Sequence, residues 1–265
     1  MVSCKYKYQS EFLKGTTCKA NCGKNSQYCF IHTTELEPKQ KVSHKEFHKF
    51  IKQHDGILEG AIFEELDIRD LIFNVSVKIV YNGNFRKADI SDSNWAYVKI
   101  YCTDFSNAVL KGWNLEGGLI KDCIFKEAIL EEAYLKKVII YNVDFSGLNL
   151  KGINLDGAML KNVKFDNCIL DEAILDDIVA MNVSFKGASL KGATLEGASL
   201  NRADLSGADL SDADLSEANL YKALLFKTKI NSNTNFTDAE VKTADFRDVF
   251  LEAVLDVVDT PELEL

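Results

Sequence analysis

The strongest constraint on this chain is a five-residue period. From Phe85 to Ile230, every fifth residue is Phe, Leu, Ile or Trp, and Ala180 is the single exception. The residue two positions before each of these is usually small or apolar, and it is Ala in every unit from Ala188 to Ala223. An α-helix repeats its faces about every 3.6 positions and a strand every two, so neither element accounts for this spacing. The sequence therefore predicts a repeat architecture built from five-residue units.

The clearest units run from Ala203 to Leu220, where Ala-Asp/Asn-Leu recurs with two variable residues between. This stretch resembles the pentapeptide repeat family. The resemblance implies an all-β fold, a right-handed quadrilateral β-helix with four units per coil. Four units per coil also follow from the sequence, because Phe recurs at the centre of every fourth unit, at Phe85, Phe105, Phe125, Phe145, Phe165 and Phe185. We expect these rings to stack inside a solenoid that spans residues 57–251.

Two flanking segments differ from the repeat and complete the predicted domain organisation. Residues 34–56 are expected to form a helix that caps the first coil, because Ser43-His-Lys-Glu46 resembles a capping box. Phe47, Phe50 and Ile51 would form the apolar stripe of this helix. Residues 252–265 are expected to form a short C-terminal cap and an acidic tail. The open ends of a solenoid need such caps.

Residues 1–33 contain a cysteine pattern that predicts a small metal-binding module. Zinc takes four Cys or His ligands, often supplied in close pairs. Cys29 and His32 form one such pair, Cys18 is a third ligand, and the fourth is either Cys4 or Cys22. The segment is similar to small zinc-binding segments of large DNA viruses and some microbes, which favours Cys4 and leaves Cys22 as the alternative. We expect a structural zinc, and the lysines and tyrosines around it suggest a nucleic-acid anchor as one function.

The outward residues of each unit give a map of four sides, numbered from the side of Phe85. The second and third sides are acidic, although lysines dilute the charge. Their main carboxylates are Glu131, Glu132, Asp171, Glu172, Asp176, Asp177, Asp209, Asp212, Asp214 and Glu217. Regularly spaced carboxylates can imitate the phosphates of DNA. The family resemblance implies the same possibility, because quinolone-resistance and gyrase-inhibitor members act on type II topoisomerases (DNA gyrase) as DNA mimics. The alternative is a solvated face, since Asp is common in the repeat itself.

The fourth side has a different chemistry, with the single acid Asp122 and the bases Lys99, Lys121, Lys161, Arg202 and Lys222. Apolar and aromatic side chains line up on it, at Tyr101, Leu119, Ile139, Tyr141, Met159, Val179 and Tyr221. Exposed apolar stripes and tyrosines are typical of protein interfaces. We therefore expect a non-enzymatic scaffold that binds a protein partner, or a second copy of itself, along this side.

Several function classes are excluded by what the chain lacks. Among its 265 residues no histidine follows His54, and there is no phosphate-binding loop or Ser-His-Asp set. An enzyme is therefore not expected. No stretch of about 18 apolar residues exists to cross a membrane, and the N-terminus lacks the apolar core of a signal peptide. Seven cysteines, an odd count, do not suggest a disulfide framework. We expect an intracellular, cytoplasmic protein with no membrane partner.

Overall fold

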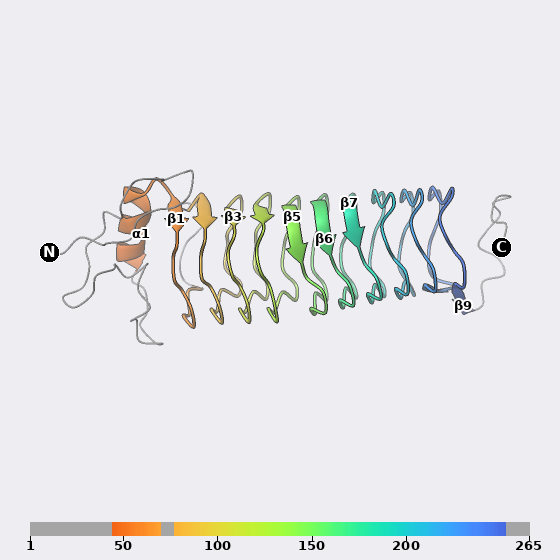
Figure 1. The fold of residues 1–265 in the computed structure, drawn as a ribbon, viewed down its shortest axis with the longest axis horizontal. Coiled ribbons are helices and arrows are strands. Elements are labelled where there is room, and N and C mark those ends of the chain that lie inside the picture. The colour runs from red at the N-terminus through yellow and green to blue at the C-terminus, as the bar shows by residue number, and fades with distance from the viewer. Residues whose placement is uncertain (1–43, 70–76, 253–265) are drawn as a thin grey trace. The chain divides into compact units, whose positions relative to one another are not determined.

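The computed structural model describes residues 44–69 and 77–252, which fall into two compact units divided between Ala128 and Ile129. In both units short parallel strands and bridges recur once per coil along the chain, and each regular coil has four five-residue sides (Figure 1). The predicted quadrilateral β-helix is therefore confirmed. The predicted zinc module and the C-terminal cap lie outside the described residues.

The first unit begins with helix α1 (His44–Gln53), followed by strands β1 (Ile57–Glu59), β2 (Ile79–Tyr81), β3 (Lys99–Tyr101) and β4 (Leu119–Lys121). The ring of Phe47 on α1 lies 6.4 Å from that of Phe63, so the helix contacts the first coil. This coil is longer than the next one by two positions, because Leu58 pairs with Val80, whereas Val80 pairs with Ile100. Within the described residues, no helix has the length and apolar character that a membrane crossing requires.

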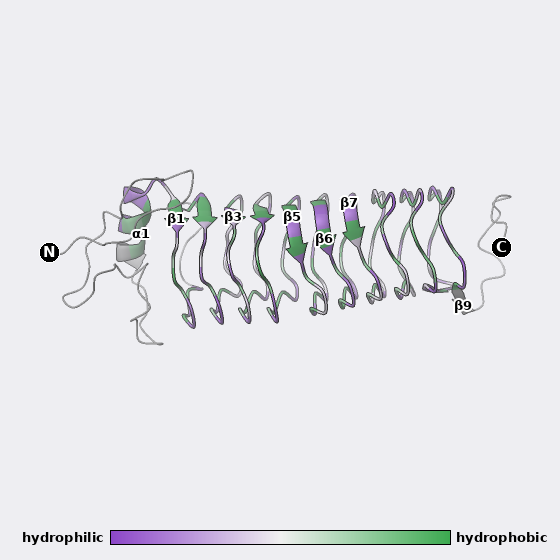
Figure 2. Cartoon of the chain, viewed as in Figure 1, coloured by the Kyte–Doolittle hydropathy of each residue, from purple (hydrophilic) through white to green (hydrophobic). Residues whose placement is uncertain are grey.

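The second unit contains β5 (Ile139–Asp144), β6 (Met159–Lys164), β7 (Val179–Ser184), β8 (Lys229–Asn231) and β9 (Phe250–Glu252). Along β5, β6 and β7 two buried residues are separated by two outward ones, because each strand turns a corner at Asn142, Asn162 or Asn182, where φ is positive. Figure 2 shows the resulting hydrophobic and hydrophilic bands on these strands.

One extra residue enters the second unit just after β8, so that Asp214 pairs with Asn235 where a regular coil would place Thr234. The wider turn is closed by Asp212, whose Oδ1 accepts hydrogen bonds from Nδ2 of Asn231 at 3.1 Å and of Asn233 at 2.7 Å. These bonds favour the carboxylate and lower the pKa of Asp212. The extra residue is thus accommodated at a single turn.

The cores of both units hold a column of stacked phenylalanine rings, as the recurrence of Phe in every fourth unit predicts. In the first unit Phe85, Phe105 and Phe125 have ring centroids 5.2 and 5.1 Å apart. In the second, Phe145, Phe165 and Phe185 follow at 5.4 and 5.1 Å. All six rings are buried. Full burial of such a side chain contributes about 1.5–3 kcal/mol, so the column is a main source of stability.

The corner of each side requires a left-handed backbone, two positions after the central apolar residue. Gly152 has φ +66° and Asn142 has φ +54° at this position. Glycine adopts this conformation without strain, and asparagine tolerates it better than most residues. The glycines of the repeated Leu-Lys-Gly segments therefore serve as corners.

Candidate interaction surface

The fourth side of the second unit presents two columns of outward residues. Strand pairing places Ile139, Met159 and Val179 in one column. The same register places Tyr141, Lys161 and Met181 in the second. The exposed fractions are 41% for Met159, 38% for Val179 and 42% for Met181. A contiguous group of apolar side chains thus faces solvent on strands β5 to β7.

The first column differs from later units, where polar residues at the equivalent position close their own turns. Oδ1 of Asp204 accepts a hydrogen bond from the Ser206 backbone N–H at 2.9 Å, and Asn219 does the same for Tyr221 at 3.0 Å. Ile, Met and Val have no acceptor for this bond. These side chains therefore contribute no hydrogen bond to the turn.

An asparagine ladder forms the corner beside these columns. Nδ2 of Asn162 donates to Oδ1 of Asn142 at 2.9 Å, and Nδ2 of Asn182 donates to Oδ1 of Asn162 at 2.8 Å. The ladder ends there, because the next equivalent positions are Arg202 and Lys222. The ladder lies within the paired strands β5 to β7, whose regular backbone pairing gives the apolar columns a rigid platform.

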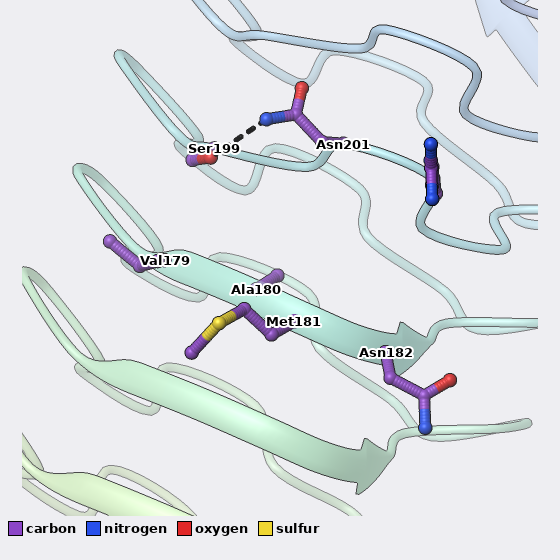
Figure 3. Close-up of a pocket in the computed structure, with 7 residues that line it drawn as sticks. Val179, Ala180, Met181, Asn182, Ser199 and Asn201 are labelled. Carbon is purple, nitrogen blue, oxygen red and sulfur yellow. Dashed lines mark hydrogen bonds between the residues drawn. The ribbon is translucent and has the colours of Figure 1, made fainter.

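A hollow of about 400 Å³ lies where the ladder ends. Its lining residues are Val179, Ala180, Met181, Asn182, Ser199, Asn201 and Arg202. Figure 3 shows Val179 and Met181 on the strand, with Asn201 turned toward Ser199, to which its Nδ2 donates at 3.4 Å. Apolar and polar groups therefore converge on one depression, as in sites that bind part of a ligand or a partner.

Comparison with known families accounts for this architecture. A model described as a pentapeptide repeat region matches residues 119–195, and a model of pentapeptide repeats in eight copies matches residues 182–225. This part of the chain belongs to the pentapeptide repeat family.

Solved structures of other pentapeptide repeat proteins are similar to this chain. HetL from the cyanobacterium Nostoc, involved in heterocyst differentiation regulation, is 25% identical, with 74% of this chain and 89% of HetL covered and a TM-score of 0.39. The plasmid-mediated fluoroquinolone resistance protein QnrB1 is 18% identical, with 73% of this chain and 91% of QnrB1 covered and a TM-score of 0.39. A thylakoid-lumen protein of Arabidopsis thaliana is 33% identical, with 40% of this chain and 70% of the plant protein covered and a TM-score of 0.23. No curated protein matches the chain by sequence.

The structure brings together some of the residues predicted for the fourth side. Ile139, Tyr141, Met159 and Val179 lie on neighbouring strands. Tyr221 lies further along the same side, half-buried, with the Lys222 ammonium 5.1 Å from its ring centroid.

Two further predicted residues, Tyr101 and Leu119, belong to the first unit. There the ring of Tyr101 lies 6.3 Å from that of Tyr81, and Leu119 on β4 is half-buried.

Many carboxylates of the acidic sides serve the pentapeptide coils themselves. Lys151 pairs with Glu172 at 3.0 Å, and Lys191 pairs with Asp209 at 3.4 Å. Oδ1 of Asp176 accepts a hydrogen bond from the Glu196 backbone N–H at 3.1 Å. Glu131 accepts a bond from Asn149, Asp171 from Ser189, and Asp214 from Ser216.

The acids at one corner of the second side are also widely spaced. Glu132, Glu172 and Asp212 occupy this corner only in every second coil, with Gly152 and Gly192 between them. On the third side, Asp177 and Glu217 are separated in the same way by Gly197. At strand spacing, two coils correspond to about 9.6 Å, so the carboxylates form a sparse array.

The predicted zinc ligands Cys4, Cys18, Cys22, Cys29 and His32 lie outside the described residues, so a structural zinc stays a prediction. In the described ranges, 44–69 and 77–252, no three His, Cys, Asp or Glu side chains are grouped to hold a metal ion.

Two thiols of the repeat region are buried and protonated. Burial raises the pKa of Cys123 and that of Cys168 to about 12. Sγ of Cys168 donates to the Phe145 carbonyl at 2.9 Å. A thiol with so high a pKa is a poor nucleophile.

Sequence reasoning missed Met181 and the asparagine ladder as parts of this surface. Their signal was present, because Met181 occupies the position of Lys161 in the next coil, and Asn recurs once per coil at Asn142, Asn162 and Asn182. The hollow beside Asn182 has no sequence signal, since it depends on how side chains of neighbouring coils pack.

Proposed function

We propose that this protein is a non-enzymatic scaffold whose second unit binds a protein partner along its fourth side. The observation that supports this most is the outward column of half-buried Ile139 and exposed Met159 and Val179. In the later units of the same side, Asn219 uses this position to close its turn. Apolar side chains here cannot close the turn in this way, and burial against a partner would remove them from water.

The rigidity of the platform supports the same proposal. The residues sit on paired strands next to the Asn142–Asn182 ladder, so few side chains need to be ordered on binding. A preorganised surface loses less conformational entropy when a partner docks. Met159 and Met181 add adaptable contact area, since the thioether side chain fills irregular gaps.

DNA mimicry directed at a type II topoisomerase is the second candidate, supported by the carboxylates of the second and third sides. Two features weaken it relative to the scaffold. Lys151 and Lys191 neutralise neighbouring acids, and glycine separates the corner carboxylates in alternate coils. Nucleic-acid anchoring by residues 1–33 is a third candidate, and it rests on the predicted zinc module alone.

The scaffold proposal is tested by comparing two matched substitutions in a capture experiment. Ile169 occupies the same position of its unit on the second side and is 44% exposed, against 38% for Val179. We expect crosslinking in cell extract to recover a partner with the wild-type chain and with Ile169→Asp, and to lose it with Val179→Asp. A partner retained equally by both variants would contradict the proposal, as would one lost equally from both.

Supercoiling assays with purified gyrase and topoisomerase IV separate the second candidate from the first. A DNA mimic inhibits or protects the enzyme, competes with added DNA and weakens with salt. The scaffold proposal expects no such competition, and expects Val179→Asp rather than changes at Glu172 or Asp177 to remove binding.

A further inference from the structure

The fourth side of the second unit is basic in a chain whose net charge is −9. From Ile139 to Lys222 its outward residues include Lys161, Arg202 and Lys222 and no Asp or Glu. All three cations are exposed, and within the described residues none of them has an ion pair. Lys222 lies over the ring of Tyr221. A partner that covers the coils from Ile139 to Lys222 therefore meets three exposed cations, and the next coil places Glu240 beside Asn219.

The hollow at the end of the ladder combines three kinds of contact. Val179 and Met181 supply apolar surface, and Arg202 supplies a guanidinium. Asn182 supplies an acceptor, because its Nδ2 is bonded to Asn162 while its Oδ1 faces the position where the ladder stops. The apolar surface of this depression is complementary to an apolar side chain of a ligand. The acceptor is complementary to a backbone N–H, and the cation to a carboxylate.

We propose that the fourth side of the second unit binds an acidic, apolar segment of its protein partner. This inference rests on the proposed scaffold function and names the chemistry of the segment. Apolar side chains pack on Met159, Val179 and Met181, a carboxylate pairs with Arg202, and a backbone N–H donates to Oδ1 of Asn182. A guanidinium holds a carboxylate through two parallel hydrogen bonds, which fixes the register of the segment.

A peptide fits this surface better than the other polyanion that cations attract, nucleic acid. Single-stranded nucleic acid is bound by aromatic rings on which bases stack, together with a continuous basic groove. Here the first column is apolar without aromatic rings, with Ile139 half-buried and Met159 and Val179 exposed, and the cations are few. The tyrosines of this side, Tyr141 and Tyr221, lie four coils apart, so they form no continuous stacking surface. Aliphatic surface is complementary to Leu, Ile and Val side chains.

The experiment selects random short peptides displayed on phage against the full chain, with three variants selected in parallel. Arg202→Glu reverses the charge at the hollow, and Val179→Asp disrupts its apolar floor. Lys227→Glu is the matched control, because Lys227 has the same left-handed corner position on the first side, with φ +57° against +62° for Arg202. Melting temperatures by circular dichroism establish that each variant is folded.

We expect the wild type and Lys227→Glu to enrich peptides that combine Asp or Glu with Leu, Ile or Val. Fluorescence anisotropy of a synthetic consensus peptide should show affinity about tenfold or more weaker for Arg202→Glu, as for loss of a hydrogen bond to a charged group. Exchange of the peptide's acid for lysine should restore binding to Arg202→Glu.

Enrichment of neutral or basic peptides by the wild type would overturn the inference, as would the absence of any enrichment. Selection of the same peptides by Arg202→Glu and by the wild type would also overturn it. Competition by single-stranded nucleic acid would assign the side to that ligand, and a dimer that Val179→Asp dissociates would assign it to a second copy. The proposed function is tested separately, because a protein partner lost with Val179→Asp supports the scaffold even where acidic peptides fail to bind.

Discussion

The fourth side of β5 to β7 and the coil from Ala203 to Leu220 use one position of the repeat in opposite ways. In the coil, Asp204, Asp214 and Asn219 each close a turn by accepting a backbone N–H. On β5 to β7 the same position carries Ile139, Met159 and Val179, which face solvent or are half-buried. The backbone and the core are alike in both. The comparison teaches that the core determines the coil, and that the outward position is free to serve either stability or recognition.

The largest expected effect on stability comes from a substitution in the core, which the two regions share. Replacing Phe165 with Ala removes the central ring of the column Phe145–Phe165–Phe185 and leaves a cavity. We expect the free energy of unfolding to fall by about 3–5 kcal/mol in guanidinium titrations. A loss below about 1 kcal/mol would mean that the ring column is not the main support of the second unit.

A smaller effect separates the two regions. Asp214 accepts from the Ser216 backbone N–H at 2.9 Å, from its hydroxyl at 2.6 Å and from Asn235 Nδ2 at 3.0 Å. Asp214→Ala should lower the free energy of unfolding by about 1 kcal/mol, because these bonds are lost. Val179→Ala, which breaks no hydrogen bond of its side chain, should change it by less than about 0.5 kcal/mol. Equal effects in the same guanidinium titrations would remove the distinction between the regions.

The smallest effect concerns pH. Hydrogen bonds from Ser216 lower the pKa of Asp214 below its ordinary value of 3.8, so the folded state favours the carboxylate. Its contribution to stability is present above the unfolded-state pKa and is lost as pH falls through the folded-state pKa.

Asp214→Asn keeps the acceptor oxygen and removes the proton equilibrium. We expect it to flatten the decline of the melting temperature below about pH 4. An unchanged profile would show that Asp214 does not take part in acid unfolding.

Much of the fold could be predicted from sequence because neighbours in a solenoid are separated by a constant length of chain. Phe145 and Phe165 are 20 residues apart, the length of one coil, so the sequence alone placed them in contact. The same holds for Ile139 and Met159. The predicted acidic and apolar sides follow from the same count. The longer first coil, with Leu58 opposite Val80, could not be counted, since its extra residues leave no regular mark. The hollow near Arg202 and the hydrogen bonds of the acidic side chains depend on rotamers, which the period does not determine.

Because β5, β6 and β7 pair in one register, the proposed binding surface is built from equivalent coils. Residues one coil apart are interchangeable in position, so excision of the single coil around Met159 would bring Ile139 beside Val179 and Asn142 beside Asn182, with Phe145 stacked on Phe185. Duplication of the same segment would lengthen the apolar column by one rung. Duplication or deletion of the gene segment for a single coil can therefore lengthen or shorten this surface in steps of one coil, while the interior packing is kept.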